Sequence, residues 1–252
     1  MIIFFVALGV GISTILGSGI GLLVREIPHR FNDAILGAAA GLMLAASILG
    51  LILPATECMV PNALLQTVLG VFCGALGISV VDRLTPHLHQ LVGVDREEHG
   101  DLEGLNRVLL FVTALAIHKL PEGLAVGVSF GTEHVGNALT VAGSIALQNI
   151  PEGMVIIAPL LAVGVSFRRT LAISLFIGFI EITGMLLGFS LVAAASVILP
   201  FALSFAGGMM LYVISDEMIP ETHSHGYEKL ATFALLAGFM FVVVADQLMS
   251  AI

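Results

Sequence analysis

The sequence is poor in charge. Only 11% of its 252 residues are Asp, Glu, Lys or Arg, whereas a soluble domain carries roughly 25%. Hydrophobic residues make up 58% of the chain, and the mean hydropathy is +1.08. A chain of this composition has too little polar surface to stay in water, which excludes a soluble fold. The formal net charge of −9 offers no basic surface, so we expect no nucleic-acid partner.

Sequence motifs of several enzyme classes are also absent. The chain has no Gly-X-X-X-X-Gly-Lys-Ser/Thr sequence, so nothing in it predicts an ATP-driven process. It has no His-Glu-X-X-His sequence, the pattern of many zinc hydrolases. The two cysteines, Cys58 and Cys73, fall at an outer loop and inside the next apolar stretch, so we expect no disulfide between them. We expect no resident cofactor.

Long apolar stretches fill the chain instead. A transmembrane helix needs ~20 mainly apolar residues, and the sequence divides into eight such spans between breaks that contain Pro, Gly or charge. The predicted fold is an all-α polytopic membrane protein with eight transmembrane helices, and residues 1–252 form a single transmembrane domain. The Gly-rich stretches 37–41 and 70–77 indicate close packing between helices. The predicted spans are 2–24, 33–54, 62–82, 105–131, 137–163, 170–192, 197–219 and 229–250.

The basic residues predict the orientation. Cytoplasmic loops of membrane proteins carry an excess of Lys and Arg. All of the nine Lys and Arg residues except Lys119 lie in or beside the loops after the first, third, fifth and seventh spans. These four loops lie on the same side of the membrane. We therefore predict a multi-pass protein of the cell (plasma or inner) membrane, with both termini outside the cytoplasm and the loop of residues 83–104 inside it.

Polar residues interrupt three of the spans near their centres. A charge at that depth costs at least ~2.5–3.5 kcal/mol on insertion scales, so a group of carboxylates there needs a compensating partner. The polar residues are His118, Lys119 and Glu122 in the fourth span, Gln148, Asn149 and Glu152 in the fifth, and Glu181 in the sixth.

The fourth and fifth spans carry matching motifs. His118 and Glu122 are four positions apart and share one helix face, and Gln148 repeats this spacing with Glu152. A proline precedes each glutamate, which removes a backbone N–H and predicts a kink. The two spans cross in opposite directions, so the motifs form an inverted pair of the kind found at transporter sites. One imidazole, two carboxylates and an amide oxygen suit a divalent transition metal. The alternative is that both glutamates only pair with Lys119 in a buried structural network.

These motifs, with eight spans and a long loop after the third, resemble the ZIP (Zrt/Irt-like) family of metal transporters. The sequence from Gln148 to Gly153 is similar to the short, GufA-like prokaryotic members. The resemblance implies a bundle with inverted-repeat symmetry, a homodimer and a site for two metal ions. The implied ligands of the first position are His118, Glu122, Gln148 and Glu152 with a thioether from Met43, and those of the second are both glutamates, residues 119 and 149, and Glu181.

The second position departs from the family pattern. Lys119 stands where the family usually has Asn, and Asn149 stands where it often has Asp. These changes remove one oxygen ligand, weaken another and add an ammonium group where a cation would bind. Our hypothesis is that Lys119 takes the place of the second metal and pairs with Glu181 and a bridging glutamate. The site would then bind one transported ion.

The inner end of the seventh span is rich in potential ligands. The resemblance indicates an exit site there, with Asp216 at a position that is often His. The long loop adds His87, His89 and His99, which could bind metal transiently. The alternative is that these charged runs are ordinary solvated surface. The predicted exit path consists of Asp216, Glu217, Glu221, His223 and His225.

The predicted function is the transport of a divalent transition metal into the cytoplasm, with zinc as the first choice and cadmium, iron or manganese as others. A mixed nitrogen and oxygen site discriminates poorly among these metals. Two other functions are considered: an intramembrane metal-dependent hydrolase, and a transporter for a different cation. Only one histidine lies within a span, whereas catalytic zinc often has several histidine ligands.

Overall fold

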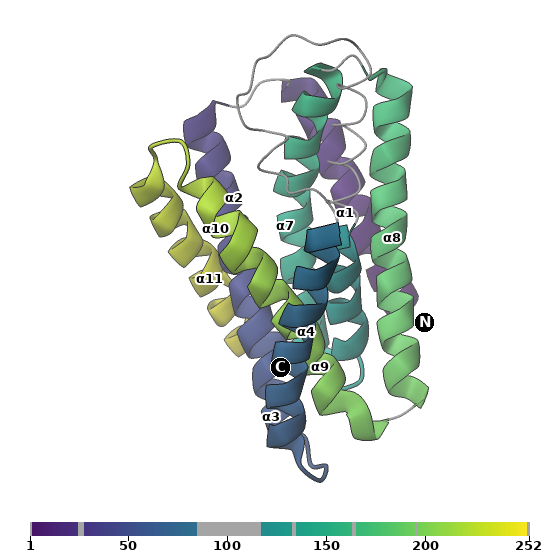
Figure 1. The fold of residues 1–252 in the computed structure, drawn as a ribbon. Helices are drawn as coiled ribbons and strands as arrows, with labels where there is room; N and C mark the ends of the chain where they lie inside the picture. The colour runs from purple at the N-terminus through teal and green to yellow at the C-terminus, as the bar shows by residue number, and fades with distance from the viewer. Residues whose placement is uncertain are drawn as a thin grey trace.

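The regular structure of this protein is helical. The computed structural model describes residues 2–24, 28–84, 117–132, 135–162, 165–194 and 196–250, and these ranges contain no β-strand. The helix over residues 117–129 carries no label in Figure 1 and is called helix 117–129. The other elements are α1 (Ile2–Val24), α2 (His29–Ala45), η1 (Ala46–Ile52), α3 (Leu53–Glu57), α4 (Ala63–Leu84), α7 (Val135–Ala162), α8 (Phe167–Ala194), η2 (Ser196–Ile198), α9 (Leu199–Val213), η3 (Ile214–Met218), α10 (Ile219–Thr222) and α11 (Glu228–Ser250).

The helices agree with the predicted spans. In the described ranges, six helical stretches are long and apolar enough to cross a membrane. Helix 117–129 and α7, which carry the two polar motifs, correspond to the fourth and fifth predicted spans. The all-α membrane fold is confirmed, and the helices are consistent with a count of eight. Individual ends differ by a few residues: α2 begins at His29 rather than at residue 33, and the carbonyl of Pro28 at its N-cap position accepts from the N–H groups of Phe31 and Asn32.

In the described ranges, two of the long helices contain a wider, π-helical segment that ends two residues before a proline. The segment η1 joins α2 to α3 before Pro54, and η3 joins α9 to α10 before Pro220. Proline has no backbone N–H, so the carbonyl four residues earlier loses its helical partner. At Pro54 this carbonyl belongs to Gly50, and Asn137 Nδ2 of α7 donates to it over 3.0 Å. A side chain of a neighbouring helix therefore satisfies the widened turn.

Glycines allow several pairs of helices to touch backbone to backbone. A Cβ at Gly41 of α2 would overlap the backbone of α11, and one at Gly74 of α4 would overlap that of α9. The predicted close packing of both Gly-rich stretches is confirmed. The glycines that follow the motif glutamates also allow close backbone contact: Gly123 lies against the backbone of α8, and Gly153 lies against that of α1. Substitution at these positions would force the helices apart.

The pairs assemble into two groups of helices. The first group contains α1, helix 117–129, α7 and α8, which contact one another through α1 and through the glycines of helix 117–129. The second group contains α2, α4, α9 and α11, in which α11 packs on α2 and α4 packs on α9. Figure 1 shows α11 and α2 at one side of the bundle and α8 at the other. Helix α7 also packs against α2 and η1, which joins the two groups.

Candidate functional site

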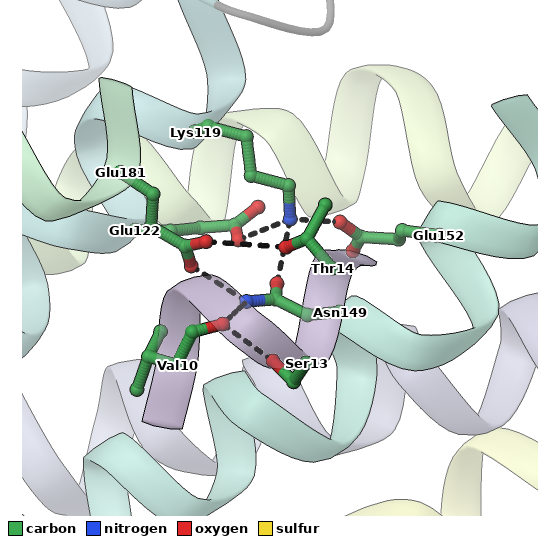
Figure 2. A network of polar contacts seen from close by, with 8 residues as sticks. All are labelled: Val10, Ser13, Thr14, Lys119, Glu122, Asn149, Glu152 and Glu181. Atoms are coloured by element: carbon green, nitrogen blue, oxygen red, sulfur yellow. Dashed lines mark hydrogen bonds and ion pairs between the residues drawn. The ribbon is translucent and has the colours of Figure 1, made fainter. Parts of the chain in front are cut away.

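The centre of the first group holds a buried lysine between two glutamates. Lys119 has none of its surface exposed. Its Nζ lies 2.6 Å from Glu122 Oε2 and 2.6 Å from Asn149 Oδ1, and it also contacts Glu152 Oε2 (Figure 2). An ammonium group has three N–H donors, and each of them therefore finds an acceptor. Lys119 and Glu122 are three positions apart on helix 117–129, as are Asn149 and Glu152 on α7, so each pair shares a helix face.

A second set of hydrogen bonds holds Glu181 of α8. Asn149 Nδ2 donates to Glu181 Oε1 over 2.7 Å and to the carbonyl of Val10 over 3.3 Å. Thr14 Oγ1 of α1 donates to Glu181 Oε2 over 3.3 Å. The amide of Asn149 is therefore oriented, with its oxygen toward the ammonium of Lys119 and its nitrogen toward the carboxylate of Glu181 (Figure 2). Four elements meet at this network.

The predicted partners of Lys119 are partly confirmed. The pairing with a bridging glutamate is correct, and it involves both Glu122 and Glu152. The predicted direct pairing with Glu181 is wrong, because the amide of Asn149 lies between the two groups and donates to that carboxylate. The sequence could not reveal this arrangement, since it depends on how α7 and α8 face each other.

The histidine of the first motif contacts the second group of helices. His118 Nε2 lies 3.0 Å from Glu217 Oε1, which belongs to the π-helical segment η3. A residue of the predicted exit path thus touches a predicted metal ligand directly. The two residues are far apart in the sequence, and no local pattern predicts their contact.

Gln148 has a buried side chain whose polar atoms are unpaired among the described residues. Within the described residues neither its amide oxygen nor its amide nitrogen has a hydrogen-bond partner, and the residue is fully buried. Leaving a buried polar group unpaired costs about 1–3 kcal/mol, so this oxygen is available to a ligand. It lies four positions before Glu152 and shares its helix face. Met43 is also buried, on α2, which packs against both α7 and η3.

No three His, Cys, Asp or Glu side chains in the described part of the chain already surround one metal position. The two motif glutamates instead surround the Lys119 ammonium. The two carboxylates therefore bind a cation that the protein supplies itself. A metal ion that used the same oxygens would have to compete with it.

The two histidines of the predicted exit path already have protein partners. His223 Nδ1 lies 2.8 Å from the carbonyl of Ile219, and its Nε2 lies 3.2 Å from Thr232 Oγ1. His225 Nδ1 lies 3.0 Å from Asp33 Oδ1. Both imidazoles therefore connect the end of α10 to other elements. Of the acidic residues, Asp216 is exposed and Glu221 is half-buried.

Sequence reasoning missed two polar residues inside spans. Asp33 of α2 is fully buried beside His225, whose ring also stacks on that of His29 at 4.5 Å between centroids. Thr14 of α1 is fully buried and reaches Glu181. Their only sequence signal is a polar residue in an apolar helix. The loop histidines His87, His89 and His99 lie outside the described residues.

The fold and this network define a class of protein. A chain made of membrane-spanning helices, with ionisable residues buried midway along them, has the construction of a membrane transporter, in which such residues are costly and functional. The comparisons with known proteins identify the family. A family model described as "ZIP Zinc transporter" matches residues 83–246. The chain belongs to the ZIP family of metal transporters, and it is a transporter rather than an enzyme, which removes the hydrolase alternative.

Curated relatives match along nearly the whole chain. The zinc transporter GufA of Myxococcus xanthus is 40% identical over 243 residues, which cover 94% of each protein. The zinc transporter ZIPB of Bordetella bronchiseptica is 38% identical over 246 residues, which cover 93% of this chain and 77% of that protein. The zinc transporter ZupT of Streptococcus mutans is 26% identical over 93% of this chain. The predicted likeness to GufA-like members is confirmed, and the family implies no cofactor beyond the transported metal.

Proposed function

We propose that this chain carries a divalent transition metal, zinc in the first place, into the cytoplasm through a site on helix 117–129 and α7. The observation that carries the proposal is the convergence of Glu122 and Glu152 on one cation, the Lys119 ammonium. Two carboxylates that share one monovalent cation are near enough to share a divalent one. The relatives named as zinc transporters support the choice of zinc. Cadmium, iron and manganese are the other candidates.

The proposed ligands lie on one face of each motif helix. His118 supplies an imidazole, and the amide oxygen of Gln148 is buried and unpaired among the described residues. With the two glutamates they form the mixed nitrogen and oxygen set that borderline divalent metals accept. Met43 adds a thioether from α2. Glu217, which touches His118, is the first acceptor on the way out, and Asp216 and Glu221 follow it.

Charge balance supports one transported ion per cycle. With all three carboxylates ionised, as in the metal-loaded site, they and the one ammonium give the network of Figure 2 a net charge of −2, which one divalent ion neutralises. The family pattern, with Asp at position 149 and no ammonium at position 119, carries four carboxylates and needs two such ions. Lys119 and Asn149 together therefore replace the second metal and the carboxylate that it requires.

The basic loops support the proposed orientation in the membrane, and this orientation identifies the driving force for uptake. We place the protein in the cell membrane with both termini outside and the loop of residues 83–104 in the cytoplasm. We also propose that it is a homodimer, as the family resemblance implies. An inside-negative potential then favours entry of a divalent ion by ~4.6 kcal/mol per 100 mV. Transport down this gradient needs no ATP.

The test is zinc uptake into proteoliposomes that contain the full chain. Glu122→Gln and Glu152→Gln keep the shape of the side chains but remove their charge, and each should abolish uptake. Glu228→Gln, on the exposed first turn of α11, is the matched control and should transport normally. Parallel assays with cadmium, iron and manganese rank the substrates. If both site variants fold and transport zinc at the control rate, the network is only structural and the proposal fails.

A further inference from the structure

Glu181 differs from the other two carboxylates of the network. Glu122 and Glu152 bind the Lys119 ammonium, whereas Glu181 accepts hydrogen bonds only from the neutral groups of Asn149 and Thr14 among the described residues. It is almost fully buried. The same Asn149 amide touches both Lys119 and Glu181, so a single amide group separates the ammonium from this carboxylate. Glu181 is therefore the one carboxylate of the network in Figure 2 that does not bind the lysine directly.

Metal loading creates a conflict at Glu122 and Glu152. A divalent ion between these carboxylates competes for their negative charge with Lys119 Nζ, which each of them now binds through Oε2. The ammonium and the metal carry charges of the same sign, and they repel strongly in a buried site. Lys119 is completely buried, so it cannot move to water without a large rearrangement. A buried charge that loses its partner is strongly unfavourable, so the ammonium needs another anion nearby.

We propose that Lys119 is a tethered counter-cation that moves from Glu122 and Glu152 to Glu181 when the metal enters, and that Thr14 and Asn149 are the positioning residues that keep Glu181 available for it. The proposal rests on the proposed function. Before loading, the two neutral donors satisfy Glu181 without cancelling its charge. When the metal binds, the Lys119 side chain moves past the Asn149 amide. Its ammonium then leaves Glu122 and Glu152 and pairs with Glu181. On release it returns and neutralises the empty site.

The test is a double-mutant cycle on cadmium affinity, measured by calorimetry on the detergent-solubilised full chain. Glu181→Gln removes the anion that receives the lysine, so cadmium should bind at least roughly tenfold more weakly, which corresponds to the loss of one charged hydrogen bond. The Lys119→Met variant has no ammonium at this position, so metal binding displaces no charge that needs Glu181 as a new partner. There, the same Glu181→Gln change should alter the Kd by less than about threefold. Equal weakening in both backgrounds would show that Glu181 binds the metal itself, and would overturn the proposal.

Thr14 supplies a second test that does not require removal of the lysine. Thr14→Val keeps the shape of the side chain but takes a donor from Glu181. The carboxylate then gains more from the incoming ammonium, so cadmium should bind roughly threefold to tenfold more tightly. Thr14→Ser retains the hydroxyl and should restore the original Kd. A purely structural role predicts unchanged or weaker binding with a lower melting temperature, and that result overturns the positioning role.

The outcomes separate this proposal from the proposed function. Cadmium binding that is unaffected by Glu122→Gln and Glu152→Gln would refute the metal site itself. Binding that those variants abolish, together with additive effects of Lys119→Met and Glu181→Gln, would refute only the lysine transfer. If the Lys119→Met protein does not fold, the Thr14 series decides.

Discussion

The second metal position can be rebuilt by two substitutions. Lys119→Asn removes the ammonium, and Asn149→Asp restores a fourth carboxylate beside Glu181. The double variant then matches the family pattern at both positions. We expect the wild-type protein to bind one zinc ion per chain and the double variant to bind two.

The structure sets the magnitudes. Two unit charges 2.6 Å apart, as in Lys119 and Glu122, interact by about 6 kcal/mol at an effective dielectric constant of ~20. Desolvation offsets much of this, and removing one partner of a buried pair costs about 3–5 kcal/mol in measured cases. The metal-free Lys119→Asn protein should lose about that much stability. The metal-free double variant should lose more, because its fourth carboxylate has no cation.

Zinc should reverse this loss only when the second position exists. A ligand at 100 times its Kd stabilises the folded state by about 2.7 kcal/mol per site. Zinc should therefore stabilise the double variant by about 2.7 kcal/mol more than the wild type at that concentration. The assays are metal content per chain by elemental analysis and thermal unfolding with and without zinc. Two ions in the wild type, or one in the double variant, would refute the charge-balance argument.

Three further substitutions, with Gly19→Ala as a control, test the packing and the hydrogen bonds of the helices. Gly17→Ala places a Cβ on the backbone of α7 and should lower the free energy of unfolding by about 1–3 kcal/mol or more. A Cβ at Gly19 would meet nothing within 4 Å, so Gly19→Ala should leave the stability unchanged. Thermal unfolding of the two variants measures the difference. Asn137→Leu leaves the carbonyl of Gly50 unpaired and should cost about 1–3 kcal/mol, and an unchanged melting temperature would contradict this. His223→Ala removes the three hydrogen-bond contacts of its ring, to Ile219, Thr222 and Thr232, and should lower stability by about 1–3 kcal/mol in the same assay.

Much of the fold could be predicted from the sequence because two strong signals act locally. The length of each apolar stretch predicts a span, and glycines in a span predict close packing, as Gly41 and Gly74 confirm. The spacing of His118 and Glu122 predicts a shared helix face without knowledge of any neighbour. These signals depend only on helix geometry and on the cost of polar groups in lipid.

The rest depends on contacts between helices that lie far apart in the sequence. Pro54 predicts an unpaired carbonyl at Gly50, but only the packed structure identifies Asn137 as its donor. The partners of Lys119 depend on the positions of α7 and α8. A lysine beside three carboxylates has several possible pairings, and their energies differ by less than sequence reasoning can resolve. The orientation of one amide, that of Asn149, decides among them.

The position of the network within the bundle constrains how the site can open. All of its residues belong to α1, helix 117–129, α7 and α8, and glycines hold these helices backbone to backbone, as at Gly123 and Gly153. Moving them apart would expose several buried charges at once, which is strongly unfavourable in a membrane. The contacts between His118 and Glu217, and between Asn137 and the carbonyl of Gly50, instead join the two groups of helices. Helix α7 also packs against α2 and η1 at this boundary, but a relative movement of the two groups would leave the ion pairs of the network intact. We therefore expect access to the site to open where those two contacts break, while the lysine and its carboxylates stay together.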